Sequence, residues 1–321
     1  MNPKGYAVYI AKRIGQAVLV LWAAYTVTYV ILNLLPKNVE QSILVARGMQ
    51  EAVGDPNAIA QVRSEFGLDE SPVRHYFTVL FAALHGDLGT SYQYGSNVAS
   101  LIATRLGMTI SVSLLAILLA VVVAFALAFA ASYFRQKTVR AILQALPTLS
   151  VSVPTFWIGL LLMQVFSFWL GLLPSIGQSG WKTMVLPVVT MAIPVSAMLS
   201  RLLMDGFDTV MREPFIVAAK AHGFSRRSIV ISHVIKNGSL PALTMLGLIV
   251  GGTVNGAIVA ETVFSRQGVG LLIQQAVQNQ DFPVVQGVVL LAAAAFVVVN
   301  LVVDLIYPLL DPRISHIAKE V

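Results

Sequence analysis

Residues Asp208 to Pro241 read DTVMREPFIVAAKAHGFSRRSIVISHVIKNGSLP, and this charged stretch separates two hydrophobic runs of membrane-spanning length. Pro214 can begin a helix, because the N–H that it lacks would have no partner in a first turn. Gly223 can end that helix, because glycine readily adopts a left-handed cap. Ser225 is placed to cap the next helix. The stretch therefore predicts a short helix and a second helix that meet at a glycine elbow.

Small side chains are predicted to lie on one face of the first short helix. Phe215, Ala218, Ala219 and His222 are three or four residues apart, the spacing that brings side chains to the same side of a helix. Small residues allow another surface to approach closely. The segment is either a docking site for a partner protein or an ordinary amphipathic loop without one.

The composition indicates an integral membrane protein. Charged residues make up 11% of the chain and hydrophobic residues 57%, whereas soluble domains are about one quarter charged. Helices are the default in lipid, because every backbone polar group must be satisfied within its own segment. A run of about 18 or more uncharged residues crosses a hydrocarbon core. We therefore predict an all-α fold with six transmembrane helices, near Ile14–Leu35, Leu106–Phe134, Ala141–Leu173, Thr183–Ser200, Gly238–Ala260 and Phe282–Val303.

The distribution of lysine and arginine predicts the orientation, because these residues concentrate in cytoplasmic loops. With the N-terminus and C-terminus in the cytoplasm, most basic residues lie inside, including those between Arg201 and Lys236. The external segment Lys37 to Arg105 then carries nearly balanced charges. The net charge of +6 is therefore mainly a topology signal and does not predict a nucleic-acid partner.

The sequence lacks the motifs of an enzyme. It has no cysteine, which excludes disulfides and thiolate metal sites. The five histidines lack the spacing of a zinc helix, so no metal site is predicted. The phosphate-binding pattern G-x-x-x-x-G-K-[ST] is also absent. We therefore expect a non-catalytic chain that holds no cofactor.

Small and polar residues at membrane depth are candidates for a pore. Gln164 belongs to the third hydrophobic run, and Gly251, Thr253 and Asn255 belong to the fifth. Polar side chains within a membrane generally face the bundle interior, while small residues also mark close contacts between helices. Pore lining and helix packing are both open for these four positions.

Several stretches are similar to one family of transporters. They are YIAKRIGQAVLVL at residues 9–21, EFGLDESPVRHYFTVLFAALHGDLGTSY at 65–92, and AIVAETVFSRQGVGLLIQQAVQNQDFPVVQGVVLL at 257–291. These resemble the dipeptide, oligopeptide and nickel branch of ATP-binding-cassette importer permeases, in the first of its two permease subunits. Ala218, Ala219 and Gly223 fall where the alanines and glycine of the family's "EAA" loop fall, although Val217 replaces the glutamate of the general pattern.

The resemblance implies a type I importer permease in the bacterial inner membrane. Its expected partners are a second homologous permease, two ATPase subunits that hold ATP and Mg, and an extracytoplasmic substrate-binding protein. The cargo implied is a peptide, with nickel, a metal–opine complex or glutathione as alternatives. The external segment would dock the binding protein or shape the pore entrance. The residues implied in ATPase coupling are Arg212, Glu213, Phe215, Ala218, Ala219, His222 and Gly223.

We expect one membrane domain with four parts. These are an N-terminal segment with the first helix (1–35), an external segment (36–105), a five-helix core (106–314) with the coupling loop 205–239, and a C-terminal tail (315–321). A stand-alone secondary transporter is the main rival, but it should show two related halves with helices broken at matching places. A membrane scaffold protein is the third possibility. No internal repeat supports the transporter rival.

Overall fold

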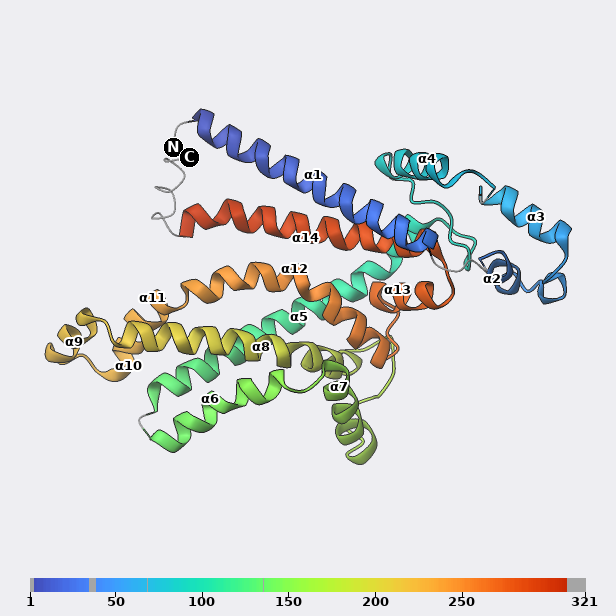
Figure 1. Cartoon of the computed structure of the whole chain (residues 1–321). Helices are drawn as coiled ribbons and strands as arrows, with labels where there is room; N and C mark the ends of the chain where they lie inside the picture. The colour runs from blue at the N-terminus through green and yellow to red at the C-terminus, as the bar shows by residue number, and fades with distance from the viewer. Residues whose placement is uncertain (1–2, 35–38, 68, 135, 311–321) are drawn as a thin grey trace. The chain divides into compact units, whose positions relative to one another are not determined.

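The computed structural model describes residues 3–34, 39–67, 69–134 and 136–310, and it leaves out the side chains of 3–10, 151, 243–244, 254–255 and 303–310. Apart from one isolated β-bridge between Thr90 and Asn97, the regular elements of these ranges are all helical, which confirms the all-α prediction. The helices (Figure 1) are α1 (Pro3–Leu34), α2 (Val39–Ala46), α3 (Pro56–Glu65), α4 (Pro72–Leu84), α5 (Val98–Tyr133), α6 (Lys137–Val151), α7 (Thr155–Met163), α8 (Lys182–Met211), α9 (Pro214–Ala221), α10 (Arg226–Ile229), α11 (Lys236–Gly238), α12 (Leu240–Val263), α13 (Val269–Gln278) and α14 (Phe282–Leu310).

Membrane-spanning character is clear for four helices within these described ranges. Ala11–Leu34, Val98–Tyr133, Lys182–Met211 and Phe282–Val302 are long and apolar enough to cross a bilayer. Two further helix pairs pass the same test together but are bent at a short break. The chain therefore has four candidate spans, or up to six if each bent pair is one span.

The third hydrophobic run is not the single straight helix that its length predicted. The run Ala141–Leu173 is divided between α6 and α7, whose axes meet at 104°. Pro154 explains the break, because it has no N–H to donate and disfavours helical backbone in the residue before it. Pro154 itself has extended backbone (φ −59°, ψ 136°). A π-helical segment, Gln164–Trp169, then continues α7.

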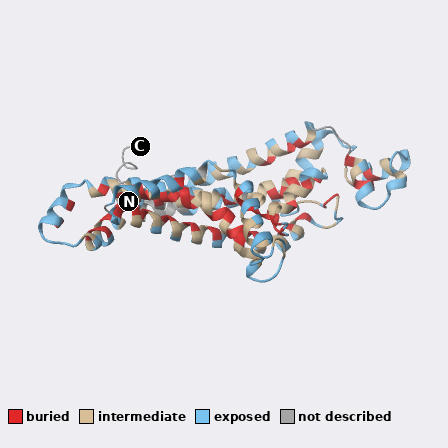
Figure 2. Ribbon diagram, turned by 90° about the horizontal axis from the view of Figure 1, so that it is seen from below, coloured by how far each residue is buried: buried red, intermediate tan, exposed pale blue. Residues whose placement is uncertain are grey.

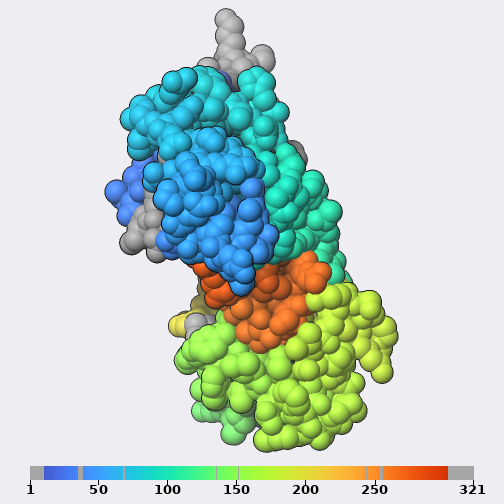
Figure 3. Space-filling model, turned by 90° about the vertical axis from the view of Figure 1, so that its right-hand side faces the viewer, coloured from blue at the N-terminus to red at the C-terminus, as the bar shows by residue number. Residues whose placement is uncertain are grey.

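The chain forms two compact units. The first comprises Met1–Met108 and Gln267–Val298. Its larger apolar core contains Leu32, Val98 and Leu272, and a second core under the short external helices contains Val39, Ile43, Leu44, Val62 and Tyr92. The external helices α2 to α4 form a continuous blue-to-cyan surface in Figure 3. The described part of the segment predicted to be external is thus a folded, largely helical part of this unit.

The second unit comprises Thr109–Arg266 and Val299–Val321. Helix α8 is its centre and packs against α6, α7 and α12. Along α5, Ala116, Ala120, Ala124 and Ala128 are buried at every fourth position. Bulky residues such as Leu118 are exposed on the opposite side of α5, and Figure 2 shows exposed positions along the long helices. An exposed apolar face of this kind suits lipid or a second membrane subunit.

Candidate functional site

The predicted elbow begins at the end of α8. Arg212 caps α8, and both Arg212 and Glu213 are exposed to solvent. Glu213 has extended backbone, and Pro214 follows it as the first residue of α9. The N–H groups of a first helical turn have no partner within the helix, so Pro214, which lacks an N–H, begins α9 without losing a hydrogen bond. The predicted helix start is confirmed.

The end of α9 is a two-bond glycine cap. Gly223 has a φ of +80°. Its N–H donates to Lys220 O at 3.0 Å, and the N–H of Phe224 donates to Ala219 O at 3.2 Å. These bonds satisfy two carbonyls of the last turn, in the pattern known as a Schellman motif. The left-handed cap predicted at Gly223 is confirmed.

The second arm of the elbow is tied to the helical bundle. Ser225 Oγ accepts a hydrogen bond from the Ser228 N–H at 3.2 Å and so caps α10, as predicted. Arg226 then donates from Nη2 to the carbonyl oxygen of Ser132, at the end of α5, at 2.6 Å. Ile229 is buried beside the core of the unit. The elbow is therefore fixed to α5 rather than hanging free.

The faces of α9 differ from the prediction. Ala219 is only 7% exposed and packs with the fully buried Ile216 in the core shared with α5 and α8. Phe215, Ala218 and His222 instead point to solvent. The four residues do not share one free face, since Ile216 and Ala219 together form the inward stripe of this two-turn helix. The exposed surface that we call the α9 outer face comprises Phe215, Val217, Ala218, Lys220, Ala221 and His222.

Two further contacts hold the base of the elbow. Arg140 on α6 forms an ion pair with Asp208 on α8 at 2.5 Å. Helices α8 and α11 touch through Gly206 and Gly238, and a Cβ atom added to Gly206 would lie 2.2 Å from the carbonyl oxygen of Gly238. Only glycine fits at such a distance. Neither contact was predicted from the sequence, although Gly206 directly precedes the charged stretch and Gly238 lies near its end.

The candidate pore residues are not gathered into one site. Gln164 is exposed at the start of the π-helical segment, while Gly251 is half-buried on α12. The Thr253 hydroxyl donates within its own helix, to the carbonyl oxygens of Ile249 and Val250. The side chain of Asn255 lies outside the described residues. Pore lining and helix packing both stay predictions for these positions.

Two charged residues near the end of α12 are buried and held by hydrogen bonds. Glu261 is fully buried and accepts a hydrogen bond from Thr109 Oγ1 at 2.6 Å. Arg266 is 1% exposed and donates to the carbonyl oxygen of Thr183 at 3.0 Å and to its hydroxyl at 3.1 Å. Burial lowers the pKa of Arg266, and the Glu261 carboxylate partly opposes this shift. Buried charges are tolerated only with such partners.

A second buried carboxylate organises the external segment. Asp281 is fully buried and accepts hydrogen bonds from Ser91 Oγ at 2.5 Å, the Tyr92 N–H at 3.1 Å and the Gln93 N–H at 3.2 Å. Burial raises the pKa of the Tyr92 phenol, and the nearby Asp281 charge raises it further. The Tyr92 phenol, which is neutral at physiological pH in any case, thus resists ionisation more strongly. Asp281 joins segments almost two hundred residues apart, a pairing that spacing in the sequence cannot predict.

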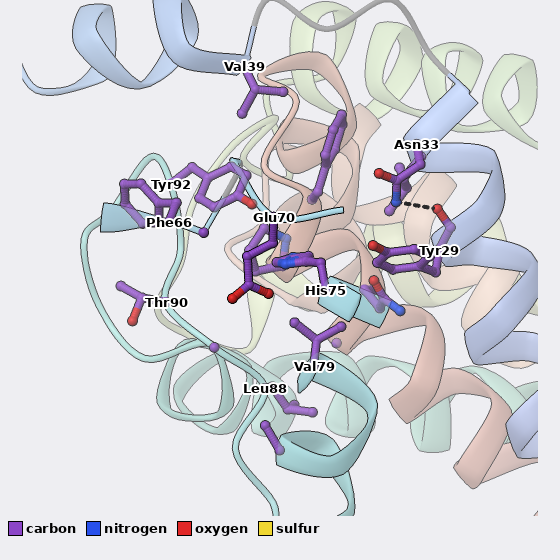
Figure 4. Close-up of a pocket in the computed structure, with 18 of the residues that line it drawn as sticks. Tyr29, Asn33, Val39, Phe66, Glu70, His75, Val79, Leu88, Thr90 and Tyr92 are labelled. Carbon is purple, nitrogen blue, oxygen red and sulfur yellow. Dashed lines mark hydrogen bonds between the residues drawn. The ribbon is translucent and has the colours of Figure 1, made fainter. Parts of the chain in front are cut away.

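A cavity of about 880 Å³ lies beside this carboxylate, within the first unit. Its walls come from α1, the external helices α2 to α4, the loop before α5 and the start of α14. In Figure 4 the rings of Tyr29 and Tyr92 enter from opposite sides, with Glu70 and His75 between them. Its volume falls in the usual range of small-molecule sites, about 300–1,000 Å³.

Comparison with known proteins identifies the family. Residues 116–316, more than half of the chain, match the family described as "Binding-protein-dependent transport system inner membrane component". The chain belongs to this family. This permease is therefore an inner-membrane component of an ATP-binding-cassette importer. It is not itself catalytic, and ATP binds to partner subunits.

Curated relatives match almost the whole permease. The glutathione transport system permease protein GsiC of Escherichia coli O6:H1 is 31% identical over 308 residues, which cover 96% of this chain and 99% of that protein. GsiC of Salmonella choleraesuis is 32% identical over the same share of both chains. The crystal structure of an amino acid ABC transporter with histidines covers 67% of this chain and 94% of its own, with a TM-score of 0.50 and 19% identity. That last similarity concerns the fold alone.

Proposed function

We propose that this permease lines the translocation pathway of its importer together with a second, homologous permease. In this proposal each bent helix pair is one span, which makes six spans with both termini in the cytoplasm. Residues 1–35, 36–105 and 106–314 then form the first span, the external segment and the permease core, with 315–321 as a tail. The four unbroken spans and the exposed apolar faces of the long helices support this arrangement.

The observation that carries the mechanism is the anchored α9 elbow. Its outer face presents Phe215 and Ala218 to solvent, while Ile216 and Ala219 are packed into the core of the second unit. We infer that an ATPase subunit binds this outer face. A rigid elbow transmits motion because its contacts with α5 and α8 leave little room for independent movement. When the ATPase subunits close around ATP, they would then move α5 and α8 through the elbow.

Arg212, Glu213 and His222 frame the inferred docking surface. All three are exposed, and they lie at the two ends of α9. Their polar side chains suit the rim of an interface whose centre is apolar. The external segment would receive the binding protein on the other side of the membrane, since it is folded and helical rather than a loose loop.

The proposed cargo is a peptide or a closely related small solute. The two curated relatives reported above are glutathione permeases by name, and glutathione is itself a peptide-like molecule. This similarity favours peptides and glutathione over nickel or a metal–opine complex. Among the described residues no cluster of His, Cys, Asp or Glu can hold a metal ion. Selection among peptides would rest largely with the separate binding protein.

The docking proposal is tested by Ala218→Glu. Ala218 is exposed, so the glutamate leaves the fold intact but places a charge in the centre of the inferred contact. We expect co-purification of the ATPase and ATP-driven uptake to fall at least tenfold, a loss typical of an interface centre. Ala219→Glu is a poor test, because Ala219 is packed into the permease's own core.

The matched control is Ala60→Glu, an exposed alanine on the external helix α3. This variant should insert and co-purify with the ATPase like the parent; uptake is not compared for it, because α3 belongs to the segment that would receive the binding protein. Equal behaviour of Ala218→Glu and Ala60→Glu would contradict the docking proposal. Uptake driven by an ion gradient with the permease alone would instead favour the stand-alone transporter.

A further inference from the structure

The external cavity contains polar groups that lack partners. Tyr25 is 5% exposed and Tyr92 is 8% exposed, and both line the cavity. Neither hydroxyl forms a hydrogen bond with any described residue. By contrast, the Tyr29 hydroxyl donates to Pro72 O at 2.8 Å. Neither hydroxyl is among the fully enclosed atoms without a partner, so both border the cavity and are open to hydrogen bonds from water or from a polar occupant.

Acidic side chains surround the same cavity. Two of the four carboxylates in its lining are held by close ion pairs: Glu40 contacts Arg63 at 2.9 Å, and Glu65 contacts Arg47 at 2.6 Å. These pairs are formed within the external segment. The negative charge that a bound molecule would encounter therefore comes mainly from the other two carboxylates of the lining.

Glu70 and Asp87 are those two carboxylates, and both are exposed. Glu70 is 3.9 Å from Arg74, whose side chain is largely in solvent, so the pairing is weak. Asp87 accepts one hydrogen bond, from the Gly89 N–H at 2.9 Å. Among the described residues of the lining, the carboxylates without a close ion pair are therefore exposed and negative, while Tyr25 and Tyr92 are buried.

We propose that this cavity binds a small organic cation, namely a protonated amine attached to an apolar group, as at the amino end of a hydrophobic peptide. The negative charge of these exposed carboxylates attracts the ammonium. The faces of the tyrosine rings favour a cation through their quadrupoles. The open hydroxyls and the Glu70 carboxylate accept its hydrogen bonds. An anion would meet carboxylates, and a purely apolar molecule would leave the hydroxyls unsatisfied.

The test measures binding to the full chain in lipid nanodiscs, with no transport step. The probe is phenylalanyl-alanine amide, and its N-acetyl form is the matched ligand without a charge. We expect the amine to bind and the acetylated form to bind at least tenfold more weakly, because acetylation removes the ammonium. Glu70→Gln should raise the Kd about tenfold, and Tyr25→Phe should raise it severalfold.

Two control variants separate this site from general surface effects. Asp69→Asn changes the neighbouring exposed carboxylate, and Tyr94→Phe removes a tyrosine hydroxyl that donates to Gln275 at 3.2 Å. Neither residue lines the cavity, so both variants should keep the parental Kd. Equal binding of the two ligands, no binding by the parent, or equal losses in Glu70→Gln and Asp69→Asn would each overturn the proposal. The readout contains no uptake, so the permease function can stand if this site fails.

Discussion

Replacement of Gly206 by alanine tests whether the close contact between α8 and α11 is required. Gly206 lies near the end of α8, and Gly238 is the last residue of α11. An alanine Cβ at position 206 would lie 2.2 Å from the Gly238 carbonyl oxygen and 3.2 Å from its carbonyl carbon. A carbon and an oxygen atom normally approach to about 3.3 Å. The two helices must therefore separate by about 1 Å.

The cost of this separation follows from which atoms collide. Both are close to the backbone, so no side-chain rotation relieves the contact. Inserting one carbon into a well-packed interior costs about 1–3 kcal/mol, and a backbone collision belongs at the upper end of that range. We therefore expect Gly206→Ala to lower the free energy of unfolding by about 3 kcal/mol.

The assay is thermal unfolding of the purified permease in detergent, followed by ATP-driven uptake in the assembled importer. Gly107→Ala on α5 is the matched control, because no atom lies within 4 Å of the Cβ that it adds. This control should unfold at the parental temperature or above it, since alanine favours a helix by about 0.5–1 kcal/mol over glycine. If Gly206→Ala and Gly107→Ala unfold at the same temperature, the close contact between Gly206 and Gly238 does not exist in solution.

Two further predictions concern the external segment and the topology. Asp281→Ala should leave three hydrogen-bond donors, from Ser91, Tyr92 and Gln93, without an acceptor and destabilise the first unit by about 3 kcal/mol. The measurement is limited proteolysis between residues 87 and 97, which should become faster. Asp69→Ala is the control, and equal proteolysis of the two variants would contradict the anchoring role of Asp281. A single cysteine at Ser64 should react with an impermeant thiol reagent in intact cells, whereas one at Thr138 should react only after the membrane is opened. Labelling of the cysteine at position 138 in intact cells would contradict the proposed orientation.

Local physics explains why the elbow could be predicted from the residues alone. Pro214, Gly223 and Ser225 act through their own backbone or through an N–H three residues away. Such effects depend on near neighbours in the chain. The membrane class was equally accessible, because hydrophobicity over about 18 residues is a property of each segment by itself.

Burial on α9 was harder to predict from spacing. Spacing placed Ala218 and Ala219 on one small-residue face, yet only Ala219 packs into the core. Adjacent helical residues differ by about 100° in direction, and a two-turn helix has too few positions to define its apolar side. The position of α5 and α8 beside α9 decided which alanine is buried.

The all-helical membrane class, the family and the helices on either side of Gly223 could be predicted from the residues alone, because they follow from local composition, local backbone preferences and matching motifs. The hydrogen bond from Ser91 to Asp281, the contact of Gly206 with Gly238 and the cavity lined by Tyr25 and Tyr92 arise only in the folded chain. Each of them joins residues far apart in the sequence. Their distances depend on how whole helices pack, which no single segment encodes.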